Sequence, residues 1–361
     1  MNSIYRAFKT FITKVSTPLP AGRGWGVGLL LLLLLSSCGP DSKHGRLKGK
    51  IDGVNQADIA AILAYVDESL DGTTGRADSI KVKRGSFTYD REITRPTILT
   101  LLYPNFSSTS LVLEPGKTVR LKGAADKLSE IEVDGTEDNN LLTEFRTRVR
   151  GKREAEVEQE AESFIHTHAS TMAAVLLFRD IFANAEVLKS NPTESLLKDL
   201  QKAQPNSPSV QALASRVTPL LATAPGKTLP AFTATDINGN AVSSASYAGN
   251  NLLIVFCAQW DASFYTMKRT ARDLNTNVPA GKLAFLFVSL DAEKEALNSA
   301  NSFDPLPGKI IYDGQSFASP LVKKLGMRYF SGSILVGPDG KIKARDIPVN
   351  KWVEKIPSLL Q

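Results

Sequence analysis

The strongest constraint on the fold of this chain is an uninterrupted apolar run, Leu252–Phe256, bounded by Gly249 and Asn250. A short apolar run between turn residues is typical of a strand buried on both faces of a sheet. A second such run, Leu283–Leu290, follows a helical pattern that covers residues 262–274. Two buried strands joined by a helix predict a parallel sheet, and therefore an α/β domain in this part of the chain.

The segments around this unit complete one domain that extends from residue 224 to residue 361. Ile334–Val336 and Lys341–Ala344, joined by a Pro-Asp-Gly turn, predict a β-hairpin, and an amphipathic helix follows from Trp352. The opening of the region resembles that of redoxin-type thioredoxin domains, and the likeness is carried by Pro225, Gly226, Lys227, Leu229, Pro230, Phe232, Asp236, Asn238 and Gly239. The resemblance implies a thioredoxin-like α/β fold.

The same resemblance implies a Trp-Cys-x-x-Cys motif at the end of the first buried strand. Here Trp260 is followed by Asp261 at the position of the attacking cysteine and, after Ala262 and Ser263, by Phe264 at the position of the resolving cysteine. Thiol–disulfide exchange needs a thiolate to attack sulfur and a second thiol to resolve the mixed disulfide. We therefore expect a redox-inactive domain without catalytic residues, in which Asp261 caps the following helix with about 1 kcal/mol.

A second family feature is also missing. The resemblance places a cis-proline just before the hairpin strand, and the equivalent position here is Ser331. A cis bond before a residue other than proline costs about 3–4 kcal/mol, so we predict a trans bond between Phe330 and Ser331. Aromatic residues in a loop-rich groove then predict a surface for a partner or ligand, formed by Trp260, Asp261, Phe264, Phe330 and Ser331.

Cys257 lies at the end of the first buried strand and has two interpretations. It is either a lone reactive thiol beside this surface or a small buried hydrophobic residue, which is how free cysteine usually behaves. The first interpretation supports an alternative function, that of a thiol-disulfide oxidoreductase or peroxidase-like protein that uses Cys257. Ser263 is not expected to act as a nucleophile, because the histidines of the chain lie outside this domain.

The N-terminus predicts a lipoprotein signal peptide over residues 1–37. The leucine run Leu29–Leu35 is too short to cross a membrane, which takes about 20 apolar residues. The charged residues before it are all basic, namely Arg6, Lys9, Lys14 and Arg23. The sequence Leu-Ser-Ser-Cys that ends at Cys38 resembles the lipobox of bacterial lipoproteins, which implies that Cys38 is lipidated. The alternative is a secreted protein in which Cys38 is an idle thiol.

The predicted signal peptide changes what the net charge of the chain implies, because it would be removed from the mature protein. Without its four basic residues the formal charge of +6 falls to +2, and no basic stripe with interleaved aromatic residues is present, so we predict no nucleic-acid partner. Cys38 and Cys257 are the only cysteines, so a lipidated Cys38 leaves no internal disulfide. The residues after Cys38 lack an acidic run, which favours the outer membrane, facing the periplasm, over the cell surface.

Residues 46–135 alternate short apolar runs with turn residues, which predicts a small antiparallel β domain after a tether at 38–45. The predicted strands are 46–52, 59–65, 79–82, 86–89, 97–103, 110–113 and 118–121. The region resembles the β-rich domain of unknown function that precedes a thioredoxin-like domain in envelope lipoproteins of Bacteroidota. The residues that carry this likeness are Asp78, Ser79, Ile80, Gly85, Ser86, Phe87, Pro96, Leu113, Glu114, Pro115 and Gly116.

Residues 136–223 have the apolar period of helices and predict an α-helical connector, with Thr193 capping a helix that runs through Leu200. His166 and His168 stand at a spacing that points them to different sides of a helix, so we predict no metal site and no cofactor.

The sequence thus predicts a multidomain α+β protein of the cell envelope, anchored to the membrane through Cys38. Its C-terminal thioredoxin-like domain is expected to be redox-inactive and to bind an envelope protein or a small ligand. A purely structural role in a larger outer-membrane assembly is a third hypothesis.

Overall fold

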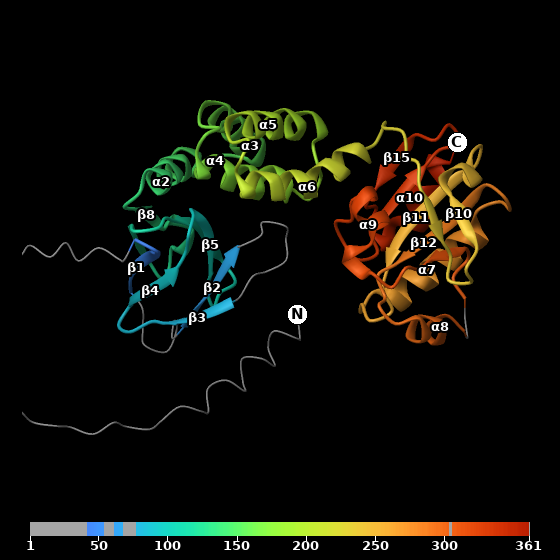
Figure 1. The fold of residues 1–361 in the computed structure, drawn as a ribbon, viewed down its shortest axis with the longest axis horizontal. Coiled ribbons are helices and arrows are strands. Elements are labelled where there is room, and N and C mark those ends of the chain that lie inside the picture. The colour runs from blue at the N-terminus through green and yellow to red at the C-terminus, as the bar shows by residue number, and fades with distance from the viewer. Residues whose placement is uncertain (1–41, 54–60, 68–76, 303–304, 361) are drawn as a thin grey trace, which may run out of the picture. The chain divides into compact units, whose positions relative to one another are not determined.

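The computed structural model describes residues 42–53, 61–67, 77–302 and 305–360 (Figure 1). The predicted signal peptide and the lipidation site Cys38 lie outside these residues. Among the residues that are described, no helix is long and apolar enough to span a membrane. The chain is a mixed α/β protein with several sheets.

The N-terminal region holds two four-stranded sheets, ordered β4-β1-β7-β8 and β3-β2-β5-β6. The bounds of their strands are β1 His44–Asp52, β2 Ala61–Asp67, β3 Ala77–Lys81, β4 Ser86–Glu92, β5 Thr97–Leu102, β6 Ser108–Leu113, β7 Thr118–Ala124 and β8 Glu132–Asp134. Alternate residues of these strands, such as Leu47 and Ile62, enter one buried cluster shared by both sheets. The neighbours are antiparallel except β1 and β7, which run parallel and so depart from the prediction of an all-antiparallel domain.

Helices follow directly after β8. They are α2 Glu137–Val149, α3 Glu154–Thr167, α4 Met172–Leu177 with its π-helical continuation η2 Phe178–Ala183, α5 Ser190–Ala203 and α6 Pro208–Ala222. The side chains of Thr136, Thr171 and Ser207 accept hydrogen bonds from backbone N–H groups in the first turns of α2, α4 and α6, as N-caps do.

The predicted cap at Thr193 is wrong. Helix α5 begins at Ser190, and the Thr193 hydroxyl inside it donates to the carbonyl of Lys189 at 2.7 Å. Pro192 is tolerated because it lies in the first turn of the helix, where a backbone N–H has no intrahelical acceptor to lose. A proline just before a threonine therefore marks the inside of this helix and not its boundary.

The helices and the second sheet share a buried cluster, in which Ile98 of β5 and Val112 of β6 pack with Leu142, Phe145 and other helical side chains. Asn139 of α2 is fully buried and pairs with both backbone groups of Val112: its Oδ1 accepts from the Val112 N–H at 3.0 Å, and its Nδ2 donates to the Val112 carbonyl at 2.7 Å. Because β6 is the last strand of its sheet, this side chain takes the place of a further strand.

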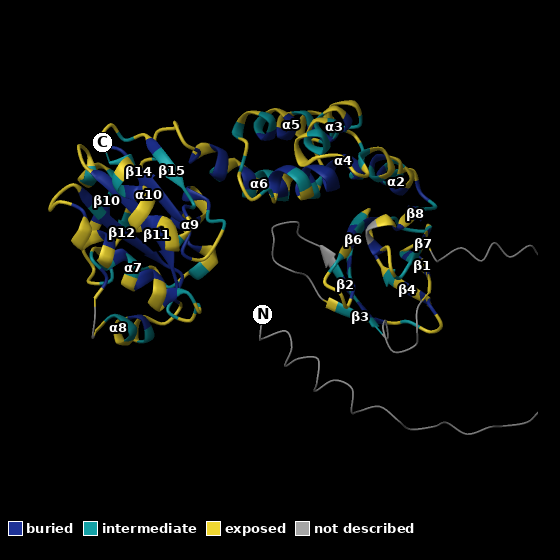
Figure 2. Cartoon of the chain, turned by 180° about the vertical axis from the view of Figure 1, so that it is seen from behind, coloured by how far each residue is buried: buried dark blue, intermediate teal, exposed yellow. Residues whose placement is uncertain are grey.

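The C-terminal domain is built on a five-stranded sheet of order β13-β12-β11-β14-β15. Its strands are β11 Asn251–Cys257, β12 Leu283–Ser289, β13 Lys309–Ile311, β14 Ser333–Val336 and β15 Ile342–Arg345, and a small hairpin of β9 Thr233–Thr235 and β10 Ala241–Ser243 precedes them. Strands β11, β12 and β13 are parallel, whereas β14 and β15 form the predicted antiparallel hairpin. Every residue of β11 is buried, as Figure 2 shows by its dark colour.

Four helices accompany this sheet: α7 Phe264–Asn277, α8 Lys294–Ser302, α9 Pro320–Leu325 and α10 Trp352–Leu359. Side chains from the two faces of β11 enter two different buried clusters. Leu253, Val255 and Cys257 pack with α7 and α10, and Leu252, Ile254 and Phe256 pack with α9. Burial on both faces explains why the apolar run of β11 is continuous in the sequence.

Candidate functional site

The candidate site lies where β11 ends and the chain turns into α7. The loop of residues 258–263 follows β11, and the loop of residues 326–332 precedes β14, the antiparallel neighbour of β11. Backbone hydrogen bonds join the two segments, because Phe256 N donates to the Gly332 carbonyl at 3.0 Å and Ser331 N donates to the Phe256 carbonyl at 2.9 Å. The sheet therefore brings Trp260, Asp261, Phe330 and Ser331 together.

Three exposed aromatic rings form what we call the aromatic cluster, namely Trp260, Phe317 and Phe330. The ring centroids of Trp260 and Phe330 are 5.1 Å apart with an edge-to-face angle of 79°, and Phe317 lies 6.4 Å from Trp260 and 6.0 Å from Phe330. Trp260 and Phe317 are each 50% exposed and Phe330 is 39% exposed. Large aromatic residues that pack on one another and remain exposed offer a contact surface to a partner.

The sequence does not predict that Phe317 belongs to this surface. It lies in η4, a 3-10 turn at Ser316–Ala318 between β13 and α9. Its only sequence signal is its position a few residues after the carboxyl end of β13, because the ends of parallel strands meet at one edge of a sheet. This signal could not be used because the sequence does not predict β13.

Asp261 and two serines form a polar network beside the aromatic cluster. One carboxylate oxygen, Oδ1 of Asp261, accepts from the Ser263 N–H at 2.9 Å and from the Ser263 hydroxyl, and Ser263 Oγ lies 2.8 Å from Ser331 Oγ. Helix α7 begins only at Phe264 and has no side-chain cap, so Asp261 closes a turn before the helix and is not its N-cap. The expectation of a helix cap at Asp261 is corrected accordingly.

Ser331 has a backbone conformation that is uncommon outside glycine. Its φ is +58°, in the left-handed region, and its peptide bond with Phe330 is trans, as predicted. The residue is 7% exposed, and its hydroxyl and its N–H both have partners within the chain. Ser331 therefore holds the loop in place and adds little to the exposed surface of the site.

Phe264 does not lie on the predicted binding surface. Its side chain is 1% exposed and packs in the buried cluster between the sheet, α7 and α10. As the first residue of α7 it points inward, because the apolar face of this amphipathic helix covers β11. The position of the resolving cysteine is therefore filled by a core side chain.

Cys257 is 1% exposed and belongs to the same buried cluster as Phe264. Burial raises the pKa of its thiol well above the ordinary value, and the nearby Asp291 carboxylate raises it further. A thiol that stays protonated and out of contact with solvent is a poor nucleophile. The geometry thus agrees with a small buried hydrophobic residue.

Asp291 is a buried carboxyl group directly beneath the loop that carries Trp260. It is 2% exposed, accepts from the Gln259 N–H at 3.0 Å and from the Ser289 hydroxyl at 2.8 Å, and its pKa is raised mainly by burial. By accepting a hydrogen bond from the Gln259 N–H, the Asp291 carboxyl group holds the start of this loop in place.

The raised pKa of Asp291 makes a prediction about stability. In the unfolded chain the group titrates near its ordinary pKa of about 3.9, whereas the native protein keeps the proton to higher pH. Its contribution to the free energy of unfolding therefore falls as pH rises from about 4 through the native pKa. We expect Asp291→Asn, which keeps an acceptor for Gln259, to gain stability relative to the parent over this pH range in urea titrations. A difference that does not change with pH would contradict the prediction.

His166 and His168, for which we predicted no metal site, have different surroundings in the structure. His166 Nδ1 lies 2.5 Å from Asp199 Oδ2 of α5, and the His168 ring stacks on Phe164 with centroids 4.3 Å apart. Among the described parts of the chain, no group of three or more His, Cys, Asp or Glu side chains is arranged to hold a metal ion.

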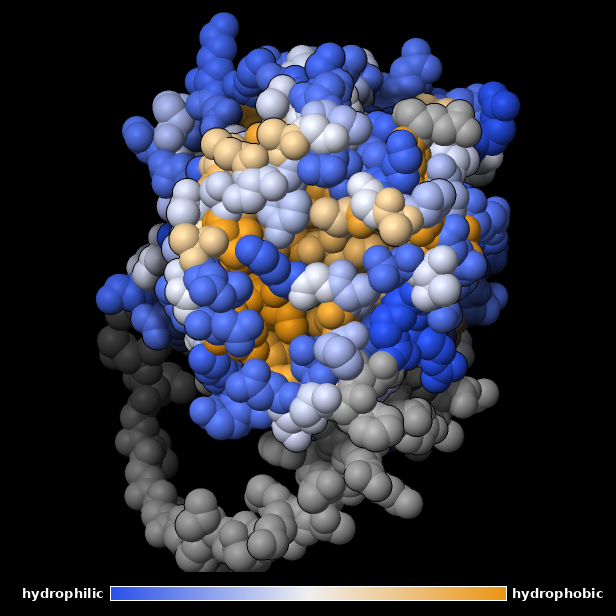
Figure 3. Space-filling view, turned by 90° about the vertical axis from the view of Figure 1, so that its right-hand side faces the viewer, coloured by the Kyte–Doolittle hydropathy of each residue, from blue (hydrophilic) through white to orange (hydrophobic). Residues whose placement is uncertain are grey.

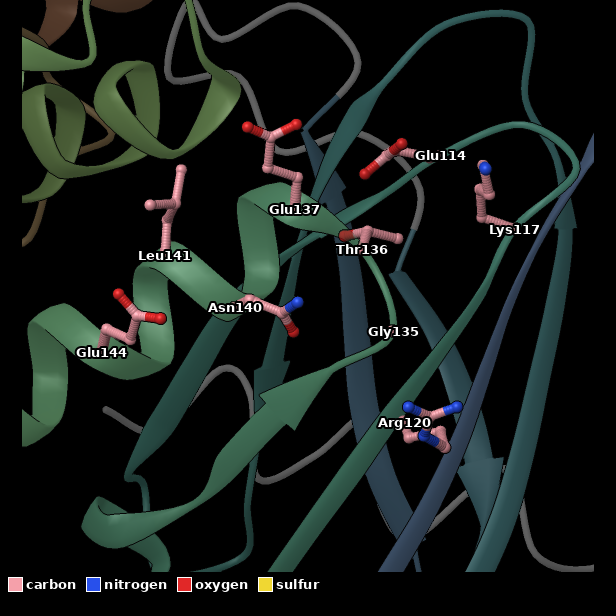
Figure 4. A pocket seen from close by; sticks show the side chains of 9 residues that line it. All are labelled: Glu114, Lys117, Arg120, Gly135, Thr136, Glu137, Asn140, Leu141 and Glu144. Atoms are coloured by element: carbon pink, nitrogen blue, oxygen red, sulfur yellow. The ribbon is translucent and has the colours of Figure 1, made fainter.

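A cavity of about 630 Å³ is formed by other residues, between the turn before β7 and the start of α2. Figure 4 shows Glu114 and Glu137 near one rim and Arg120 below, and the other lining residues are Lys117, Gly135, Thr136, Asn140, Leu141 and Glu144. Arg120 pairs with Asp134 at 2.6 Å. The lining mixes both signs of charge and carries no arrangement of a nucleophile with a base.

Comparison with known proteins gives one family match and several similar solved structures. Residues 46–142 match the family described as Domain of unknown function (DUF4369). No curated protein matches the chain. The chain is similar to the thioredoxin domain of a thiol-disulfide oxidoreductase from Bacteroides vulgatus, with 20% identity, 38% of this chain, 99% of that chain and a TM-score of 0.35. It is also similar to a thiol-disulfide oxidoreductase from Bacteroides fragilis, with 29% identity, 37% of this chain, 99% of that chain and a TM-score of 0.35.

Proposed function

We propose that this chain is a lipid-anchored protein of the bacterial cell envelope whose thioredoxin-like domain is redox-inactive and acts by binding a partner protein or a small ligand. The observation that carries the proposal is the aromatic cluster, which is exposed at the tip of β11 where a thioredoxin-like enzyme would present its thiols. Asp261 and the buried Phe264 occupy the two thiol positions. The anchor at Cys38 is part of the proposal and rests on the lipobox.

The thioredoxin-like assignment is supported by the order of elements in the C-terminal domain. A strand, helix, strand unit with parallel strands is followed by an antiparallel hairpin and a closing helix, in the order that the resemblance implied. The loops that carry the aromatic cluster follow the carboxyl ends of β11 and β13 or precede β14. Ligands of open α/β sheets bind outside the carboxyl ends of the strands.

Binding is further supported by the surface of this domain. The side shown in Figure 3 has a continuous area of hydrophobic side chains surrounded by hydrophilic ones. Tyr329 beside the aromatic cluster is 46% exposed, and the Arg328 guanidinium lies 5.2 Å from the centre of its ring. The guanidinium of Arg328 is itself engaged by the backbone carbonyls of Ala185 and Glu186, so it is the exposed aromatic rings, a residue type enriched where proteins bind one another, that support binding.

The alternative, an oxidoreductase or peroxidase that uses Cys257, is opposed by the burial of that thiol. Both functions are tested with the full protein. We expect no insulin reduction above the uncatalysed rate and no alkylation of Cys257 under native conditions. Measurable turnover together with rapid native alkylation would replace the binding proposal with the alternative.

The binding surface itself is tested by capture from cell envelopes with the intact lipoprotein. We expect Trp260→Ala combined with Phe330→Ala to lose the proteins or ligands that the parent retains, because truncation of a central aromatic anchor costs at least about 2 kcal/mol of binding. Val353→Ala serves as the matched control, since Val353 is 41% exposed on α10 and outside the aromatic cluster. Equal capture by the parent and the double variant would contradict this surface.

A further inference from the structure

A small cavity of about 180 Å³ lies where β6 meets α2 and η2. It is independent of the aromatic cluster. Its lining is mainly polar and consists of Ser108, Thr109, Ser110, Leu128, Ile131, Arg146 and Asp180. Pockets for whole cofactors or drug-sized ligands usually measure about 300–1,000 Å³, so this cavity is matched to a single small group.

The guanidinium of Arg146 is incompletely satisfied at this cavity. Its Nη2 donates to the backbone carbonyl of Ser110, whereas its Nη1 is buried and has no hydrogen-bond partner. Burial lowers the pKa of Arg146, but a guanidinium remains protonated in proteins. A buried charged donor without an acceptor is costly, and it indicates an acceptor that the protein itself does not supply.

A second donor lines the same cavity. Tyr103 is 1% exposed, and its hydroxyl donates to Thr109 Oγ1 at 3.1 Å. Because Thr109 accepts this bond, its own hydroxyl proton is available to another acceptor. The chain from Tyr103 through Thr109 thus ends in a donor at the wall that also holds Arg146.

Asp180 is the negative charge at this cavity and would repel an anion if it were unopposed. Its Oδ1 accepts from Arg179 Nε at 2.7 Å, and Arg179 Nη2 donates to Ser110 Oγ at 3.1 Å. Arg179 is 7% exposed, whereas the Asp180 side chain is 36% exposed, so the ion pair reaches from the interior to the surface of the protein. Two guanidinium groups against one carboxylate leave a net positive charge, which favours a bound anion.

We propose that this cavity binds a small oxyanion, a carboxylate or phosphate group, with Arg146 Nη1 and the Thr109 hydroxyl as its donors. Arginine suits this role because its donors match the oxygens of both groups. The net charge, the volume and the unpartnered nitrogen all select for an anion of this size.

The test uses the purified full chain and measures the thermal midpoint while sodium phosphate or sodium acetate replaces sodium chloride at constant ionic strength. We expect a saturable rise in the midpoint with at least one of the two anions. A rise with phosphate alone identifies a phosphate site, a rise with acetate alone identifies a carboxylate site, and a rise with both identifies a general oxyanion site. No saturable rise with either anion would overturn the proposal.

Variants locate the effect. We expect Arg146→Gln to abolish the saturable rise and Arg148→Gln, on the same helix but exposed, to retain it. Thr109→Val keeps the shape of the side chain and should weaken the apparent affinity by about tenfold, the value of one hydrogen bond to a charged group. If Arg146→Gln does not fold, Thr109→Val decides alone: an unchanged affinity for the anion would overturn the assignment.

Discussion

Replacement of both Asp261 and Phe264 by cysteine is expected to give a protein that reduces insulin. The double variant restores Trp-Cys-x-x-Cys on a turn that leads into α7. A thiol at residue 261 would lie before the helix N-terminus, which stabilises the thiolate and lowers its pKa. A thiol at residue 264, one turn away and buried, would be placed to resolve the mixed disulfide.

This variant is expected to be less stable than the parent, because truncation of a buried phenylalanine lowers the free energy of unfolding by about 3–5 kcal/mol. The fold is therefore checked by circular dichroism before the turnover of insulin is measured. Asp261→Ser combined with Phe264→Ser controls for the loss of packing and should remain inactive. A folded double-cysteine variant that neither turns over insulin nor forms a disulfide between residues 261 and 264 would show that the loop has diverged beyond the two side chains.

Replacement of Asn139 by leucine is expected to destabilise the N-terminal region by about 2–5 kcal/mol. The change leaves the N–H and the carbonyl of Val112 buried without partners, and each such group costs about 1–3 kcal/mol. It also removes the bond from Asn139 Nδ2 to Thr136 Oγ1, which is 2.8 Å long. Urea titration monitored by far-ultraviolet circular dichroism measures the loss.

Asn140→Leu is the matched control, because Asn140 is the next residue on α2 and is exposed. Substitutions at such surface positions usually change stability by about 0.5 kcal/mol or less. Similar losses in both variants would mean that leucine disturbs α2 in general and that the bonds to Val112 contribute little.

The sequence predicted most of the elements that are buried on both faces or that alternate cleanly. Strands β11 and β12 were evident because burial on both faces makes their apolar runs continuous. Helix α8 and strand β13 were not predicted, because α8 buries only Leu297 and β13 is three residues long at the edge of the sheet. Short edge elements carry too few apolar residues to produce a period.

The candidate site was predicted in part for a similar reason. Trp260, Asp261, Phe330 and Ser331 could be brought together from the sequence because the family resemblance places the first two after the first buried strand and the last two just before the hairpin strand, facing the same site. Whether Phe264 faces solvent or core depends on where α7 begins, and the terminus of a helix is uncertain by a residue or two in any sequence analysis. The cavity at Arg146 depends on contacts between β6 and the helices that no local pattern encodes.

The loop that ends at Ser331 has a consequence for selectivity. Its N–H is already bonded to Phe256, so a ligand that lies against this end of the sheet cannot be recognised by adding a strand at that point. A ligand at this point would then be recognised by the faces and edges of the aromatic rings and by the Asp261 carboxylate, and the rings can pack against side chains of many types. A protein with such a surface would select its partners by contour and tolerate wide variation in their amino acids.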